Sequence, residues 1–214
     1  MTRRQLAQMA AFGALGLLAG CDEDAHWHSI DVSDSSPPLK FAMTRVEDGK
    51  PVTEADYRGG LALLYFGYTF CPDVCPTTLA NLDDILGRLG AAAKHIRVLF
   101  VTVDPDRDTP PVLAAYVGNF GPEMVGLRGT PDQLAALARR YRIVYSVRPA
   151  DAQHPYEVTH SSAVYVFDRT GAAQLMVPSL ASSAPDIAGT TQDLRRLVDN
   201  PPRPGFWTRL MRRV

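Results

Sequence analysis

Residues 61–89 read LALLYFGYTFCPDVCPTTLANLDDILGRL, and the rest of the chain is organised around this stretch. It opens with LALLYFG, a short apolar run typical of a buried strand. Its second half carries leucines spaced three and four residues apart, as on one face of a helix: Leu79, Leu82, Leu86 and Leu89. Cys71 and Cys75 lie between the two, where a strand is expected to give way to a helix.

The prolines around the two cysteines predict where this helix begins. Cys71 precedes Pro72 and Cys75 precedes Pro76, and a residue before proline avoids the helical region of backbone space. Proline suits the first helical position, so we expect a loop at CPDVC and a helix from Pro76, with Cys75 as its N-cap. A sulfur near unpaired N–H groups and the positive end of the helix dipole should have a lowered thiol pKa.

Size and composition limit the classes of protein to consider. The chain has 214 residues, of which 46% are hydrophobic and 21% charged, which fits one globular domain with appended segments. A net charge of −1, with no basic patch, argues against a nucleic-acid-binding protein. The three cysteines are too few for a scaffold built on disulfides.

The N-terminus has the form of an export signal. Arg3 and Arg4 precede an apolar stretch that ends in LAGC, which resembles the lipobox of bacterial lipoproteins. The resemblance implies a signal peptide over residues 1–20, cleavage before Cys21 and lipidation of that cysteine. We expect the mature protein at the periplasmic face of the bacterial inner membrane, anchored by lipid. An uncleaved anchor or an ordinary signal peptide is the alternative.

Two further segments flank the expected domain at residues 39–199. Residues 21–38 are polar and end in Pro37-Pro38, so we predict a flexible tether. Its His26 and His28 could hold a metal, although such pairs are more often incidental. Residues 200–214 form a basic tail with its apolar side chains on one helical face. This tail is either a weak membrane contact or a frayed end.

The periodicity of the remaining sequence predicts an α/β fold. Apolar runs indicate strands over residues 39–46, 61–67, 97–103, 124–127, 143–147, 163–167 and 174–177. Helices are expected from Pro76, Pro110 and Pro131 and over residues 186–198, with Thr109 and Thr130 as caps and Gln133 completing a capping box. This alternation predicts a central mixed sheet flanked by helices, in a thioredoxin-like arrangement.

The spacing of the cysteines leaves two kinds of chemistry open. Three residues separate Cys71 from Cys75, whereas thioredoxins have C-x-x-C. The pair can form a disulfide, or hold a metal between thiolates, which select Cu(I), Zn or iron–sulfur iron. Because two sulfurs do not complete a zinc or cluster site, a third ligand is sought. His160, just before a predicted strand, is one candidate, although such a histidine is usually structural.

Three motifs together resemble one family. FGYTFCPDVCPTTL, VTVDPDRDTP and YEVTHSSAVYVFD, in this order, are similar to the signatures of the SCO/SenC family of copper-binding assembly proteins. The resemblance covers about residues 39–198. It implies a thioredoxin-like fold, with Cys71, Cys75 and His160 as copper ligands. Thr159 stands where the family often has aspartate, a residue that could orient the imidazole.

The resemblance favours a metallochaperone that does not turn over a substrate. It implies that Cu(I) or Cu(II) is carried to the binuclear copper centre in subunit II of cytochrome c oxidase. The alternative is a thiol–disulfide oxidoreductase that uses Cys71 and Cys75 to maintain the cysteines of a copper-site protein. A peroxidase of thioredoxin-like fold is a weaker third option. Four charged residues follow the second long strand: Asp104, Asp106, Arg107 and Asp108. We expect them to dock a partner, to support a loop, or to form a structural turn held by an Asp–Arg pair.

Overall fold

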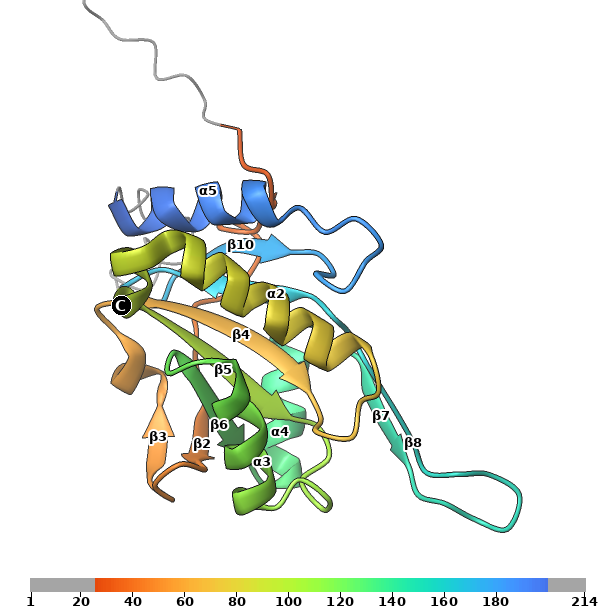
Figure 1. Ribbon diagram of the computed structural model, residues 1–214. Helices are drawn as coiled ribbons and strands as arrows, with labels where there is room; N and C mark the ends of the chain where they lie inside the picture. Colours follow the sequence, from red (N-terminus) through yellow and green to blue (C-terminus); the bar gives the residue numbers. More distant parts are fainter. Residues whose placement is uncertain (1–25, 200–214) are drawn as a thin grey trace, which may run out of the picture.

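A computed structural model describes residues 26–199, and these residues form an eight-stranded mixed sheet with helices on both faces (Figure 1). The strand order is β1-β10-β9-β4-β5-β6-β2-β3. The strands of this sheet are β1 (Ile30–Asp31), β2 (Ala42–Arg45), β3 (Pro51–Thr53), β4 (Leu61–Gly67), β5 (Ile96–Thr102), β6 (Met124–Arg128), β9 (Val164–Phe167) and β10 (Ala173–Val177). The predicted α/β class and mixed central sheet are therefore confirmed.

The centre of the sheet is parallel. β4 pairs with β5 along its whole length, from Leu61 opposite Ile96 to Gly67 opposite Thr102, and β6 continues the parallel order. All seven residues of β4 are buried, as expected for a parallel strand covered on both faces. The carboxyl ends of β4 and β5 therefore meet at one edge, and the loops that follow them lie side by side.

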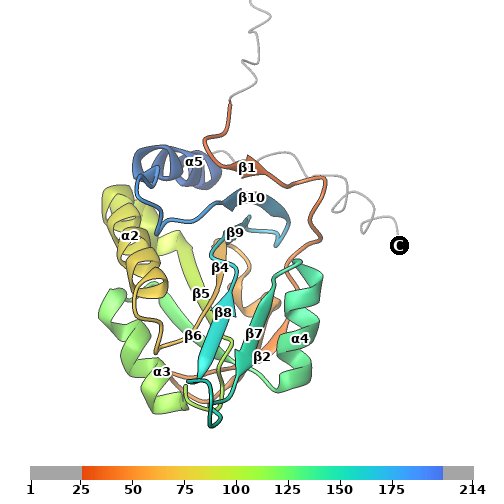
Figure 2. The same ribbon diagram turned by 90° about the vertical axis from the view of Figure 1, so that its right-hand side faces the viewer.

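Within residues 26–199, four α-helices cover this sheet: α2 (Val74–Leu89), α3 (Pro110–Val117), α4 (Pro131–Arg140) and α5 (Ile187–Asp199). Figure 2 shows α2 and α3 on one face and α4 on the other, and α5 packs against α2. The same residues also contain three short 3-10 helices: η1 (Glu54–Tyr57), η2 (Gly90–His95) and η3 (Gly118–Phe120). No helix in the described part of the chain has the length and apolar character needed to cross a membrane.

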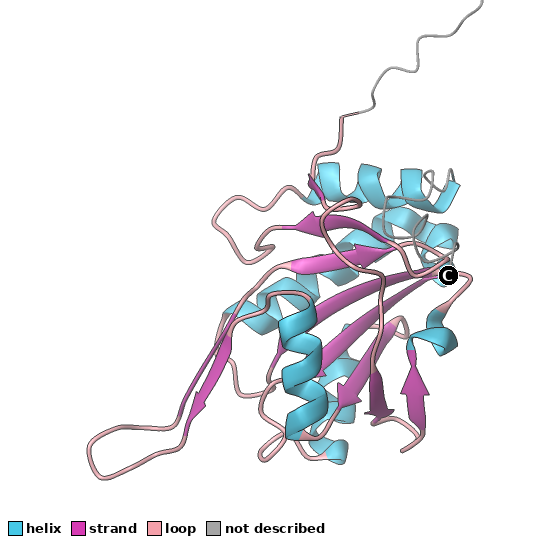
Figure 3. Cartoon of the chain, turned by 180° about the vertical axis from the view of Figure 1, so that it is seen from behind, coloured by secondary structure: helices cyan, strands magenta, loops and turns pink. Residues whose placement is uncertain are grey.

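A separate hairpin extends from the body of the domain (Figure 3). It consists of β7 (Tyr145–Arg148) and β8 (Glu157–His160), which pair only with each other among the described strands. The sequence predicted a strand near β7 but missed β8, whose polar EVTH sequence lacks an apolar run. This hairpin carries His160 at the end of β8.

The predicted start of α2 was wrong. The helix begins at Val74 with Asp73 as its N-cap, so Cys75 lies inside its first turn. Pro76 is tolerated there because the N–H groups of the first turn have no partner within the helix. Thr130 and Gln133 do form the predicted capping box, whereas the Thr109 side chain makes no capping hydrogen bond.

The predicted flexible tether was also wrong from Trp27 onward. The ring of Trp27 lies 4.2 Å from the Arg196 guanidinium carbon, and Ile30–Asp31 joins the sheet beside β10. Ser29 N–H donates to Oδ2 of Asp193 at 2.7 Å, and that carboxylate is buried in α5. The predicted signal peptide, Cys21 and the tail at residues 200–214 lie outside the described residues.

Candidate metal centre

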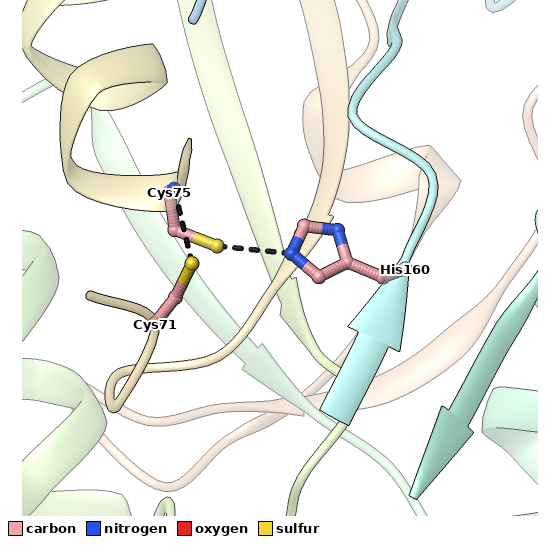
Figure 4. Close-up of side chains that lie close together, drawn as sticks. All are labelled: Cys71, Cys75 and His160. Carbon is pink, nitrogen blue, oxygen red and sulfur yellow. Dashed lines mark hydrogen bonds between the residues drawn. The ribbon is translucent and has the colours of Figure 1, made fainter. Parts of the chain in front are cut away.

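The fold brings Cys71, Cys75 and His160 together at the carboxyl edge of the parallel strands (Figure 4). Cys71 lies in the loop after β4, Cys75 in the first turn of α2, and His160 at the end of β8. One ligand atom from each residue lies within 4.8 Å of the other two. Nε2 of His160 is 3.1 Å from Sγ of Cys75. These residues are the only group of three potential metal ligands in the described part of the chain.

The loop between β4 and α2 holds the sulfurs of Cys71 and Cys75 close together. Cys71 N–H donates to the Tyr68 carbonyl at 3.3 Å, and Cys75 N–H lies 3.4 Å from Sγ of Cys71. Both thiols are free. Cys75 is fully buried and Cys71 is partly exposed, so Cys71 is the sulfur that a partner can reach.

Gly67, the last residue of β4, makes room for the buried sulfur. A Cβ at this position would lie 2.9 Å from Sγ of Cys75 and 2.7 Å from the ring of Phe100. Both neighbours are fully buried and cannot move into solvent. This requirement was not predictable from the sequence, because a glycine at the end of a strand, as in FGYT, is common and signals no close contact.

Burial decides the protonation of the site. Desolvation raises the pKa of Cys75 to about 12, so the predicted lowering by the helix N-terminus was wrong. Burial also lowers the pKa of His160, which keeps its imidazole neutral at neutral pH. A neutral imidazole can act as a metal ligand, whereas the buried thiol must lose its proton when a metal binds.

The His160 ring is oriented by a backbone carbonyl. Nδ1 of His160 lies 3.0 Å from the Ser161 carbonyl oxygen, and a proton on Nδ1 leaves the Nε2 lone pair facing the sulfurs. The rings of Tyr65 and Tyr68 lie edge-on to the imidazole, with centroids 6.1 and 5.8 Å away. The hydroxyl of Thr159, the position at which the family often has aspartate, is 3.0 Å from Ser146 Oγ across the hairpin. The Ser161 carbonyl thus provides the orienting contact.

The acidic loop after β5 supports the loop between β4 and α2, here called the thiol loop. Loop support and an Asp–Arg pair were both among the predicted roles of this segment. Asp108 is buried and accepts hydrogen bonds from the Thr69 hydroxyl at 2.6 Å and the Thr102 hydroxyl at 2.5 Å. It also accepts from Thr69 N–H at 3.1 Å. Burial raises the pKa of Asp108. Asp104 pairs with Arg107, while Asp106 is exposed.

The remaining histidines of the described chain lie away from this group. His28 contacts Asp186 Oδ2 at 3.4 Å and Gln192 Oε1 at 3.2 Å, near α5. His154 contacts Asp151 in the hairpin loop, and His95 ends η2 at the opposite edge of the sheet. His26 is exposed. The structure therefore brings neither His26 nor His28 into a group of three ligands.

The donor set fits copper. Two thiol sulfurs and one neutral imidazole nitrogen are soft or intermediate ligands, which favour Cu(I) over Mg²⁺ or Ca²⁺. A structural zinc site has four protein ligands, so a site with three protein ligands leaves one position open by comparison. The site therefore suits a copper ion held by few protein ligands.

Comparisons with known proteins agree with this chemistry. The family model SCO1/SenC matches residues 39–198. The mitochondrial SCO2 homolog of Bos taurus is 42% identical over 125 residues, covering 58% of this chain and 47% of that protein. The mouse mitochondrial SCO1 homolog is 38% identical over 133 residues, which are 61% of this chain and 46% of that protein. The chain thus spans about half the length of these curated relatives.

Solved structures extend the comparison to the fold and the metal. ScoI of Bradyrhizobium japonicum with copper bound is 32% identical, with a TM-score of 0.65, and covers 75% of this chain and 99% of that one. Yeast Sco1 with copper bound is 30% identical, with a TM-score of 0.66, and covers 78% and 91%. These neighbours confirm the thioredoxin-like fold. This chain is a member of the SCO1/SenC family.

Proposed function

We propose that this protein binds one copper ion through Cys71, Cys75 and His160 and passes it on during the assembly of cytochrome c oxidase. The observation that carries the proposal is the 3.1 Å approach of His160 Nε2 to the buried sulfur of Cys75, with Cys71 beside it. The copper-bound ScoI and Sco1 relatives support the choice of metal.

The acceptor we propose is the binuclear copper site of cytochrome c oxidase subunit II, or a similar copper-site protein. Two thiolates and a neutral imidazole around Cu(I) carry a net charge of −1, and an incoming thiolate can add at the open position. Cys71, the partly exposed sulfur, is the ligand that such a partner can reach. Cu(II) would take a further oxygen ligand at the same open side.

A thiol–disulfide oxidoreductase is the second candidate. One partly exposed and one buried thiol match the division between an attacking and a resolving cysteine. In that reaction Cys71 attacks a partner disulfide to form a mixed disulfide, and Cys75 displaces the partner. The partner gains two electrons and two protons, and a Cys71–Cys75 disulfide forms. This reaction needs no imidazole.

We also propose the location and domain organisation expected from the sequence. Residues 1–20 act as a lipoprotein signal peptide, and lipidated Cys21 holds the protein at the periplasmic face of the bacterial inner membrane. The LAGC motif supports this proposal. Mass spectrometry of the membrane fraction would detect a diacylated or triacylated N-terminal cysteine, and an unmodified Cys21 would contradict it.

His160→Ala separates the two functions. If the protein is a copper carrier, this variant loses most of its Cu(I) affinity in competition with a chelator but still forms the Cys71–Cys75 disulfide. His154→Ala is the matched control, since that imidazole lies in the exposed hairpin loop and, among the described residues, forms side-chain hydrogen bonds with Asp151 alone. Unchanged copper affinity in His160→Ala would contradict the proposed site.

A further inference from the structure

The hairpin that carries His160 has no backbone pairing with the main sheet. β7 and β8 pair only with each other among the described strands. An isolated two-stranded hairpin is at best marginally stable in water. The position of His160 relative to the sulfurs therefore depends on the side-chain contacts that fix the hairpin to the body of the domain.

A buried carboxylate makes one of these contacts. Oδ1 of Asp104 accepts a hydrogen bond from the Tyr156 hydroxyl at 2.7 Å, and Oδ2 accepts from Arg107 Nε at 2.5 Å. The Asp104 residue is only 1% exposed. Tyr156 directly precedes β8, four residues before His160. Asp104 thus connects the end of β5 to the hairpin.

Arg107 extends this connection to the thiol loop. Its guanidinium carbon lies 3.8 Å from the centroid of the Tyr156 ring and 4.7 Å from that of Phe70, which precedes Cys71. It also lies 5.8 Å from the ring of Tyr68, whose edge faces His160. A planar guanidinium can stack on aromatic faces while its Nε–H donates to a carboxylate. Arg107 therefore lies between the two segments that supply the ligands.

We propose that Asp104, Arg107 and Tyr156 form a latch that holds the His160 hairpin against the thiol loop. The proposal rests on the proposed copper site and assigns these three as positioning residues. With the latch closed, His160 Nε2 stays beside Cys75. With it open, the hairpin can move about its base, the imidazole leaves the metal, and copper is held by two sulfurs alone. Opening the latch then speeds copper release.

A graded set of variants tests the latch. Tyr156→Leu removes both the hydroxyl and the ring, while Tyr156→Phe keeps the ring over Arg107 and loses only the hydrogen bond to Asp104. Tyr145→Phe is the matched control, because Tyr145 lies opposite His160 in the hairpin and its hydroxyl makes no hydrogen bond within the described residues. Thermal unfolding of each variant reports whether the body of the domain remains folded.

The first measurement is hydrogen–deuterium exchange in the metal-free chain. We expect faster exchange over residues 145–160 in Tyr156→Leu, an intermediate effect in Tyr156→Phe and none in Tyr145→Phe. The second is the rate at which the Cu(I)-loaded chain loses copper to a chelator. A hydrogen bond to a charged group typically changes an equilibrium by about tenfold or more, so Tyr156→Leu should lose copper about tenfold faster.

A third measurement reports directly on the imidazole. In the Cu(II)-loaded chain, nitrogen coupling from His160 in the electron paramagnetic resonance spectrum should weaken in Tyr156→Leu and persist in Tyr145→Phe. Unchanged hairpin exchange, or an unchanged rate of copper loss, in Tyr156→Leu would overturn the latch. If that variant does not fold, Tyr156→Phe decides by the same criteria. A wild-type chain that binds no copper would overturn the proposed function instead, and the exchange data would still decide the latch.

Discussion

Gly67→Ala is expected to disturb both stability and the metal centre, because the new methyl group has no space. The added Cβ would lie 2.7 and 2.8 Å from two ring carbons of Phe100 and 2.9 Å from Sγ of Cys75. Ordinary van der Waals contacts begin at 3.4 Å, so these neighbours would have to move by roughly half an ångström or more. Both neighbours are fully buried, and overpacking of a dense core costs about 1–3 kcal/mol.

The displaced sulfur gives this substitution a second, functional effect. Cys75 can only move away from the β4 end, which changes its 3.1 Å approach to His160 Nε2. We therefore expect a lower free energy of unfolding in urea and a weaker Cu(I) affinity in chelator competition. The two effects should appear together in the same variant.

Gly87→Ala provides the matched control. Gly87 lies in α2, and a Cβ there would meet nothing within 4 Å. Replacing glycine by alanine inside a helix stabilises it by about 0.5–1 kcal/mol. The two substitutions should thus change stability in opposite directions. A Gly67→Ala protein as stable as wild type, with full copper affinity, would refute the packing argument.

Three further predictions concern the pH dependence of Cu(I) binding, the docked N-terminal segment and the helix caps. Because burial raises the pKa of Cys75 to about 12, Cu(I) must displace the thiol proton when it binds. The affinity for Cu(I) should therefore rise by at least about tenfold per pH unit between about pH 7 and 9. A Cu(I) affinity that does not depend on pH would contradict this. Asp193→Ala should lower the free energy of unfolding in urea by about 1–3 kcal/mol, because the N–H groups of His28 and Ser29 lose their acceptor. The same variant should be cleaved faster before Val32 in limited proteolysis, and an unchanged cleavage rate would argue against a docked N-terminal segment. Thr130→Ala should cost about 1 kcal/mol in the same urea assay, and Thr109→Ala less, since only Thr130 makes a capping hydrogen bond; equal costs would contradict this assignment.

The long apolar elements were predictable from sequence because burial on both faces leaves a continuous signal. LALLYFG and RVLFVTV correspond closely to β4 and β5, and the helix ending at Leu89 has the leucine face expected of α2. The short polar strands were not predictable in this way. β8 faces no continuous core, so its sequence shows neither an apolar run nor a clear alternation.

The residues of the candidate site could be named from sequence, but their environment could not. The cysteine pair was found from its place between a strand and a helix, and motif resemblance assigned His160 as the third ligand. The raised pKa of Cys75, by contrast, depends on how deeply the first turn of α2 is buried. The docking of the N-terminal segment was missed because its anchor, Asp193, lies more than 160 residues away in sequence. The contact of Tyr156 with Asp104 was also missed, because these residues are 52 positions apart and only the fold brings them together.

X-ray absorption of the Cu(I)-loaded, thiol-reduced chain, combined with metal analysis, tests the central claim most directly. We predict one copper per chain, coordinated by two sulfurs and one imidazole nitrogen, with the nitrogen contribution absent in His160→Ala. A wild-type spectrum that shows sulfur ligands alone, or a reduced chain that retains no copper, would contradict the proposed metal centre.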